Sequence, residues 1–181
     1  MTLDWFRLSL VFALLACCSL HAKEVTSAWF ADGKFIEESE SQRMTNGIGG
    51  RLDFTEDPDF LKNWRTHWNS VSSVKRLESV YIVLFIVCNY DQEQHIAYDL
   101  TIKGPTGSVC VSFTNLAAAK QNAVPTTSTH VAEPTIRLGP RFTIFTTDPP
   151  DPAGIYTVEV VLHDRLRKTN LKLTKRLNVI K

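Results

Sequence analysis

The stretch from Asp148 to Asp164, DPPDPAGIYTVEVVLHD, joins a proline-rich corner to a long alternating run. From Tyr156 to Leu162 every second residue is apolar, and a period of two is typical of a strand that buries one face. The prolines cannot donate to a β-ladder, so we place them in the turn before the strand. The stretch therefore predicts a corner followed by a half-buried strand.

Three residues of this stretch carry a more specific signal. Pro152 and Gly154 shape the corner, and Tyr156 follows immediately after it. In Greek-key sandwiches a tyrosine at such a corner buries its ring and bonds its hydroxyl to the corner backbone. We therefore assign Pro152, Gly154 and Tyr156 structural roles. We predict a mainly β protein, an immunoglobulin-like antiparallel β-sandwich of about seven to nine strands.

Two other segments predict further elements: one a central strand of the sandwich, the other a short helix. Val80–Cys88 is apolar on both faces, which indicates a central strand that is covered on both sides. Asp57 and Pro58 are residues that favour the start of a helix, and the residues after them are apolar at helical spacing. We expect one short helix near residues 58–65 over one end of the sandwich, with Trp64 as a structural core residue.

The chain divides into three parts. Residues 1–22 are expected to be an export signal, because Arg7 precedes an apolar run, Leu8–Ala16, that is too short to span a bilayer. Residues 23–50 are polar and contain several glycines, which predicts an irregular arm or an edge hairpin. Residues 51–181 have the length of a single β-sandwich domain. These parts predict an exported protein of the bacterial periplasm.

The cleavage site of this leader has two interpretations. Leu14–Cys17 resembles a bacterial lipobox, in which Cys17 receives a lipid that tethers the protein to a membrane. Cleavage after Ala22 instead releases a protein without an anchor. Both interpretations stay open, and Cys17 is the lipidation candidate.

Cleavage after Ala22 leaves Cys88 and Cys110 as the cysteines of the mature chain. An oxidising compartment makes a bridge between such a pair the default expectation. If the strands around them form a simple meander, however, the two residues lie about 16 Å apart. A bridge needs Cα atoms within about 7 Å. On that register we expect no intramolecular disulfide.

The charge of the chain is almost balanced, with 20 Lys and Arg residues against 19 Asp and Glu residues. A nucleic-acid-binding domain is usually strongly basic, so we expect no nucleic-acid partner. The basic residues from Arg165 onward predict a solvated strand that its lysines protect from edge pairing. The alternative is a patch for an acidic partner or for anionic lipid head groups. The weakly apolar segment Thr114–Pro134 predicts a long loop.

The sequence contains no recognisable catalytic or metal-binding motif. It lacks a Gly-x-Ser-x-Gly elbow, a His-Glu-x-x-His helix, a phosphate-binding glycine loop and a Cys-x-x-Cys pair. The histidines of the mature chain are scattered along the sequence, which does not favour a local metal site. We therefore predict a protein that is not an enzyme, with no catalytic, cofactor-binding or metal-binding residues.

Three motifs in fixed order resemble a known group of proteins. They are Asp57-Pro58 followed by Trp64, the run DLTIKGPTGSV from Asp99, and PAGIYTV from Pro152. Together they are similar to a family of small exported bacterial proteins with an immunoglobulin-like β-sandwich and no established biochemistry. The resemblance covers residues 51–181 and implies a fold and a compartment. Since one fold serves many functions, it implies no activity.

Two non-enzymatic functions fit these features. The first is an exported binding module that recognises another cell-envelope protein through loops or an edge strand, as an immunity or inhibitor protein does. The alternative is a periplasmic assembly factor or chaperone that adds a strand to its client. An enzyme of unrecognised type is the third class. We expect contact with a membrane only through an N-terminal lipid.

Overall fold

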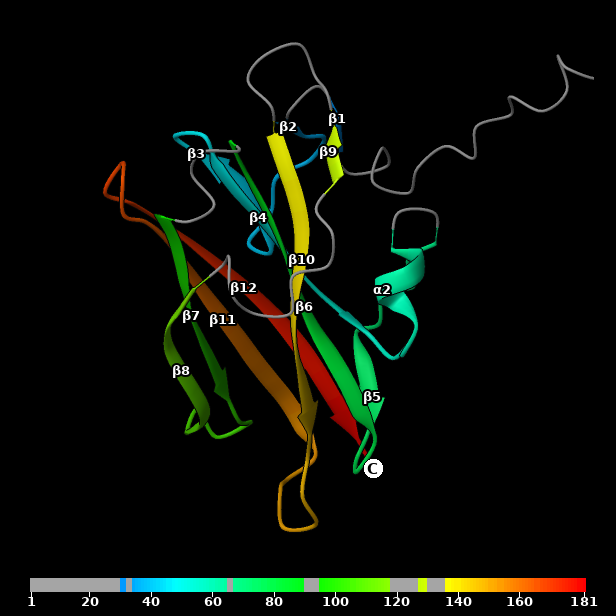
Figure 1. Cartoon of the computed structure of the whole chain (residues 1–181). Coiled ribbons are helices and arrows are strands. Elements are labelled where there is room, and N and C mark those ends of the chain that lie inside the picture. Colours follow the sequence, from blue (N-terminus) through cyan, green and yellow to red (C-terminus); the bar gives the residue numbers. More distant parts are fainter. Residues whose placement is uncertain (1–29, 32–33, 65–66, 90–94, 118–126, 130–135) are drawn as a thin grey trace, which may run out of the picture.

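The computed structural model describes residues 30–31, 34–64, 67–89, 95–117, 127–129 and 136–181. Two twisted β-sheets lie face to face, and one very short helix packs on the outside (Figure 1). The prediction of a mainly β sandwich with one short helix is confirmed. The predicted leader, with Cys17, lies outside the described residues.

The first sheet is antiparallel throughout and has the strand order β3-β4-β6-β10-β9. Its longest strands, β6 and β10, pair over eleven residues without a break in register. The five strands are β3 (Gln42–Thr45), β4 (Ile48–Thr55), β6 (Ser79–Asn89), β10 (Ile136–Thr146) and β9 (Thr127–Thr129).

The second sheet has the strand order β5-β12-β11-β7-β8 and is antiparallel except for the β5–β12 pair, which is parallel. Without the three-residue β9, the two layers contain nine strands, which agrees with the predicted range. A separate short hairpin joins β1 (Phe30–Ala31) to β2 (Lys34–Phe35). The strands of the second sheet are β5 (Ser73–Lys75), β12 (Thr169–Ile180), β11 (Gly154–Asp164), β7 (Ile96–Lys103) and β8 (Val109–Ala117).

The main core lies between the sheets, and β11 shows why these residues form it. Tyr156, Val158, Val160 and Leu162 are each at most 1% exposed, whereas the residues between them are partly exposed. This is the predicted alternation. Each fully buried side chain of this kind contributes about 1.5–3 kcal/mol, an upper estimate because unfolded chains also bury surface.

A second core lies on the outer face of the first sheet. Val83 and Phe85 of β6 point to this side. The residues that alternate with them point into the main core, namely Ile82, Leu84 and Ile86. The helix α2 (Phe60–Asn63) and the residue after it cover them, with the ring centroids of Trp64 and Phe85 5.6 Å apart. The prediction that β6 is buried on both faces is therefore confirmed.

The helix differs from its prediction in length and place. It has four residues and covers a sheet face rather than an end of the sandwich. Asp57 does not cap it; instead its Oδ1 accepts the Asp59 N–H at 2.8 Å, in the turn before the helix. Such a short helix is stabilised by the burial of Phe60 and Trp64 rather than by its own hydrogen bonds.

Gly139 and Pro140 have the composition of a turn, which predicts two short strands on either side of them, Thr135–Leu138 and Phe142–Thr146. This prediction is wrong. The backbone continues through both residues as one strand, β10. Proline is tolerated there because β9 pairs only with Ile136–Leu138, so β10 is the edge strand at Pro140.

The simple meander assumed around the cysteines is also wrong. β6 pairs with β4 and β10, and the chain then crosses to the second sheet, where β7 pairs with β8. Cys88 is buried in the first sheet, Cys110 is exposed on the second, and no disulfide joins them. The expected lack of a bridge is borne out, but for a different geometric reason.

The predicted arm contains part of the sandwich. β3 and β4 form a hairpin whose turn residues, Asn46 and Gly47, have φ angles of 47° and 79°. Positive φ at both central residues is the hallmark of the type I′ turn that Asn-Gly favours. The hairpin spans residue 50, so strands of the first sheet lie on both sides of that residue.

Candidate functional site

The corner before β11 is a structural feature. The Tyr156 hydroxyl donates to the Pro152 carbonyl oxygen at 2.9 Å, and the ring is 1% exposed. Gly154 has a φ of 142°, and a Cβ at this position would lie 2.9 Å from Pro105 Cγ. This is the geometry expected of a tyrosine corner, and it holds β11 in register.

Asp53 of β4 is the most completely buried charged residue of the described part, at 0% exposure. Its Oδ2 accepts from Arg51 Nη2 at 2.6 Å and from Trp68 Nε1 at 2.9 Å. Its Oδ1 accepts from Ser70 Oγ at 2.5 Å and from Lys175 Nζ of β12. The carboxylate thus joins the two sheets and the loop before β5.

These contacts determine the charge of Asp53. Burial raises the pKa of its carboxyl, but the positive charges of Lys175 and Arg51 and the hydrogen bonds outweigh burial and hold the pKa below its usual value. Because both oxygens are fully engaged, Asp53 has no capacity left for a ligand. Its role is structural. In the sequence, Lys175 interrupts the apolar face of β12, and this interruption was the one signal of the cluster.

A polar hollow of about 390 Å³ lies beside this cluster, between residues 36–42 and β12. Arg51 and Lys175 line it, but both turn their charged groups to Asp53. Glu37 and Glu38 line it as well, so its charges are mixed. The hollow favours no class of ligand.

His163 lies on the outer face of the second sheet, between two oxygen acceptors. Its Nδ1 is 2.9 Å from Asn170 Oδ1, and its Nε2 is 2.9 Å from Asp99 Oδ2. Burial lowers the pKa of the imidazole, but the hydrogen bonds that it makes to Asn170 and Asp99, together with the charge of Asp99, raise the pKa by more, so the net shift is upward. Since both ring nitrogens are engaged, His163 ties three strands together and is not placed as a free base.

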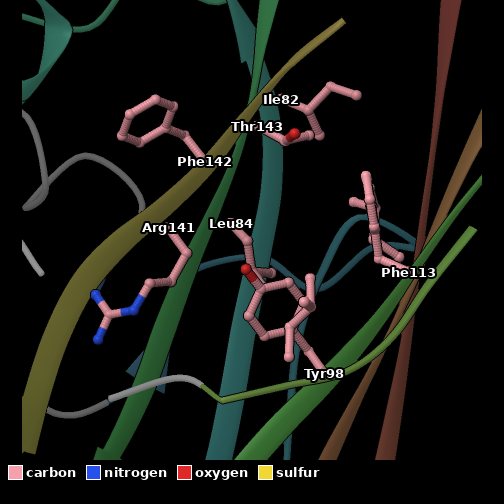
Figure 2. Close-up of a pocket in the computed structure, with 9 residues that line it drawn as sticks. Ile82, Leu84, Tyr98, Phe113, Arg141, Phe142 and Thr143 are labelled. Carbon is pink, nitrogen blue, oxygen red and sulfur yellow. The ribbon is translucent and has the colours of Figure 1, made fainter. Parts of the chain in front are cut away.

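The open side of the sandwich, where β7 and β8 of the second sheet face β6 and β10 of the first, contains an apolar cleft with a cavity volume of about 100 Å³. Figure 2 shows Tyr98 and Phe113 entering it from the second sheet, and Ile82 and Thr143 from the first. The Phe142 ring turns away from them, toward the outer core. The lining consists of Ile82, Leu84, Tyr98, Leu100, Phe113, Leu116, Arg141, Phe142 and Thr143.

The strand that bounds one side of this cleft, β8, is an uncharged edge strand. It contains no charged residue and pairs on one side only, with β7, in the part of the chain that the structure describes. Phe113 is 45% exposed although it lies on the side of β8 that faces the cleft. The loop predicted for Thr114–Pro134 is partly strand, because β8 continues to Ala117 and β9 lies within the same segment. Small polar residues in this segment are typical of a loop, so the sequence did not predict that β8 extends along this edge.

Among the described residues no three His, Cys, Asp or Glu side chains come together as metal ligands would. In those same residues no helix is long and apolar enough to cross a membrane. The cleft is therefore the feature with the clearest capacity to bind something, and its chemistry is apolar.

No protein-family model matches the sequence, and no curated protein matches it. Distant structural matches do exist. The alkylpurine DNA glycosylase AlkC of Pseudomonas fluorescens, solved bound to DNA with an abasic site analog, matches with 10% identity and a TM-score of 0.40 over 75% of this chain and 31% of that chain. A family 123 glycoside hydrolase of Clostridium perfringens matches with 6% identity and a TM-score of 0.37 over 75% and 28%.

A third match, the FixG-related protein of Vibrio parahaemolyticus, has 11% identity and a TM-score of 0.35 over 75% of this chain and 98% of that chain. The chain spans only about a third of the length of the first two proteins. The β-sandwich is established by the structure of the chain itself, and these distant likenesses add nothing to it. No match identifies the family that the sequence motifs resemble, and these likenesses carry no information about activity.

Proposed function

We propose that this protein is an exported, non-enzymatic binding module that recognises another protein of the cell envelope. The binding site is the open side of the sandwich, at the cleft between β8 and β10. The observation that carries the proposal is the apolar cleft, which receives side chains from both sheets and opens beside an exposed phenylalanine.

The composition of the cleft supports protein recognition. Its lining offers aromatic and aliphatic side chains with a few polar groups, the mixture typical of the buried centre of a protein interface. A single large side chain of a partner fits a cavity of about 100 Å³. An aromatic or aliphatic anchor in such a pocket commonly provides most of the binding energy.

Exposure at β8 supports the same site. Phe113 is 45% exposed at the cleft mouth, and the strand around it has no charge that would keep it hydrated. Sheet edges that meet only solvent usually carry lysine, proline or inward charges. The predicted leader supports an envelope location for the partner.

The direct test places a photo-crosslinking phenylalanine analogue at position 113 in cells that make the full chain. We expect one discrete covalent adduct of defined mass, whose partner is identified by mass spectrometry and then binds the purified protein. The matched control carries the analogue at Val109, which is 57% exposed on the same strand but does not line the cleft.

The control decides what an adduct means. An adduct from position 113 and not from 109 supports the cleft as the site. Equal labelling from both positions, or none from either, contradicts the proposal. A Phe113→Glu variant that keeps full affinity for the purified partner contradicts it as well.

A further inference from the structure

The open side of the sandwich presents two sheet edges, and they differ as templates for another strand. β8 forms the edge of the second sheet, and β10 forms the edge of the first sheet beyond the reach of β9. A partner that adds a strand must pair with one of them, because an exposed edge offers its free N–H and C=O groups.

β8 is the poorer template because its register with β7 shifts twice. The shifts lie between Tyr98 and Leu100 and between Ile102 and Lys103, opposite two extra residues of β8. At the first shift Asn115 has a φ of 58°, and its N–H donates to Asp99 Oδ1 at 2.7 Å. Bulges bend an edge and interrupt its ladder, so the longest regular run left on β8 is the three residues Val111–Phe113.

β10 is the better template because its register is unbroken. Phe142–Thr146 pairs residue for residue with β6, and β9 covers only Ile136–Leu138 on the other side. Among the described residues, no strand pairs with the far side of Phe142–Thr146. Pro140, which has no N–H, lies just before this stretch and separates it from the part that β9 covers.

The chemistry of this edge selects the incoming segment. Phe142–Thr146 reads FTIFT and has no charge, and Ile144 is 57% exposed on it. Side chains of an added strand point alternately to the two faces of the sheet, so every second one enters the cleft beside Leu84 and Phe113. A charged side chain there would lose its hydration, and the one charged residue of the lining, Arg141, is 2% exposed and already has an interaction partner within the protein.

We propose that the partner contributes an extended, uncharged segment of about five residues, which pairs with Phe142–Thr146 of β10 and inserts alternate apolar side chains into the cleft. This inference rests on the proposed binding function and names the kind of partner. The segment completes the first sheet and covers the cleft at the same time.

The test uses the purified full chain and three fluorescent, end-capped peptides of equal length. One alternates threonine and valine, the second groups the same residues into a threonine block and a valine block, and the third replaces the valines by glutamate. By fluorescence anisotropy we expect the alternating peptide to bind at least about tenfold more tightly than either other peptide. Two lysine variants locate the edge: Ile144→Lys on β10 and Ser112→Lys, its matched control, on β8.

We expect Ile144→Lys to weaken binding of the alternating peptide by about tenfold or more and Ser112→Lys to leave it unchanged. Both residues are exposed, so each variant is expected to fold, which circular dichroism checks. The reverse order of effects would assign the segment to β8 and overturn the inference. Equal affinity for all three peptides, or no binding, would also overturn it.

Two further outcomes separate this inference from others. If gel filtration shows a dimer that Ile144→Lys dissolves, the occupant of β10 is a second copy of the chain and the inference is wrong. If crosslinking from position 113 succeeds while no peptide binds, the binding module stands and strand addition fails. If crosslinking also fails, the proposed function itself is wrong.

Discussion

The two long sides of the sandwich are built differently. On one side, which we call the closed side, β3 and β4 of the first sheet contact β12 of the second. The Thr174 N–H donates to the Glu40 carbonyl oxygen at 2.8 Å, so a backbone hydrogen bond joins the layers there. Gly50 lets them approach closely, since a Cβ on it would lie 2.7 Å from Leu173 Cδ1. On the open side, the layers leave a cleft.

Under the proposed function, one fold places stability on one side and binding on the other. On the closed side, the buried carboxylate of Asp53 is fully hydrogen-bonded, because donors reach it from both sheets and from the loop before β5. The open side keeps Phe113 and Ile144 half exposed, and each of its two sheets ends there in a strand edge. We therefore expect substitutions on the closed side to affect folding, and substitutions at the cleft to affect partner binding.

The largest expected effect is at Asp53. Asp53→Ala leaves Lys175 and Arg51 beside an empty space, and removing one member of a buried ion pair costs about 3–5 kcal/mol of unfolding free energy. Urea denaturation measures this loss. The matched control is Glu159→Ala: Glu159 also pairs with two lysines, Lys103 and Lys172, but on the outer face. We expect the control to lose less than about 1 kcal/mol. Equal losses would mean that burial does not distinguish the two sites.

Tyr156 sharpens the comparison, because its ring packs against Phe145 of β10 with centroids 5.5 Å apart. Tyr156→Ala removes a buried aromatic side chain, so we expect a loss of about 3–5 kcal/mol in unfolding free energy. Tyr156→Phe removes only the hydrogen bond to Pro152 and is expected to lose about 1 kcal/mol. A loss under about 1 kcal/mol for the alanine variant would show that the ring does not stabilise the core.

A smaller, pH-dependent effect is expected at His163, which braces the strands behind the open side. The raised pKa of its imidazole means that the folded state favours the protonated form. Its stabilising contribution is therefore complete below the ordinary pKa of about 6.5 and is lost as the pH rises through the higher folded value.

The measurement compares thermal unfolding of the natural protein and His163→Gln at about pH 5.5 and about pH 8.5. At the lower pH we expect the natural protein to be more stable than His163→Gln, by less than about 1 kcal/mol because the His163–Asp99 pair is partly exposed. This difference in stability between the two proteins is expected to shrink at the higher pH. A difference that grows with pH would contradict the assigned charge state.

The smallest expected effect is at Lys172. It is 55% exposed, and its Nζ lies 3.0 Å from Glu159 Oε1. Exposed ion pairs contribute little, so Lys172→Ala should change the unfolding free energy by no more than about 0.5 kcal/mol. A larger loss, measured by urea denaturation, would indicate that the outer face of the second sheet supports the fold more than its exposure implies.

Much of the fold was predictable because its signals are local. Alternation in β11 identified the buried face, and the corner from Pro152 to Tyr156 identified the sandwich. The uninterrupted apolar run of β6 indicated a strand covered on both faces, and Trp64 was expected to be a core residue. Each of these signals lies within a few residues of the structure that it predicts.

The errors arose where pairing between distant segments decides the outcome. Residues around Pro140 have the composition of a turn, but β6 extends them into one strand by pairing along their whole length. The crossing from β6 to the second sheet left no mark in the sequence, so the meander assumed for Cys88 and Cys110 was wrong. The candidate site was missed altogether, because its lining comes from four strands that are dispersed along the chain.

The sequence by itself determined that this chain forms strands with one buried face and closes a corner on Tyr156, because periodicity and turn chemistry act between near neighbours. Only the tertiary structure decided which edges remain free. Closing one side with Asp53 and Lys175 and leaving a cleft at the other depends on which strands lie opposite each other across the two sheets. That arrangement is a property of long-range pairing, and no single strand of the sequence records it.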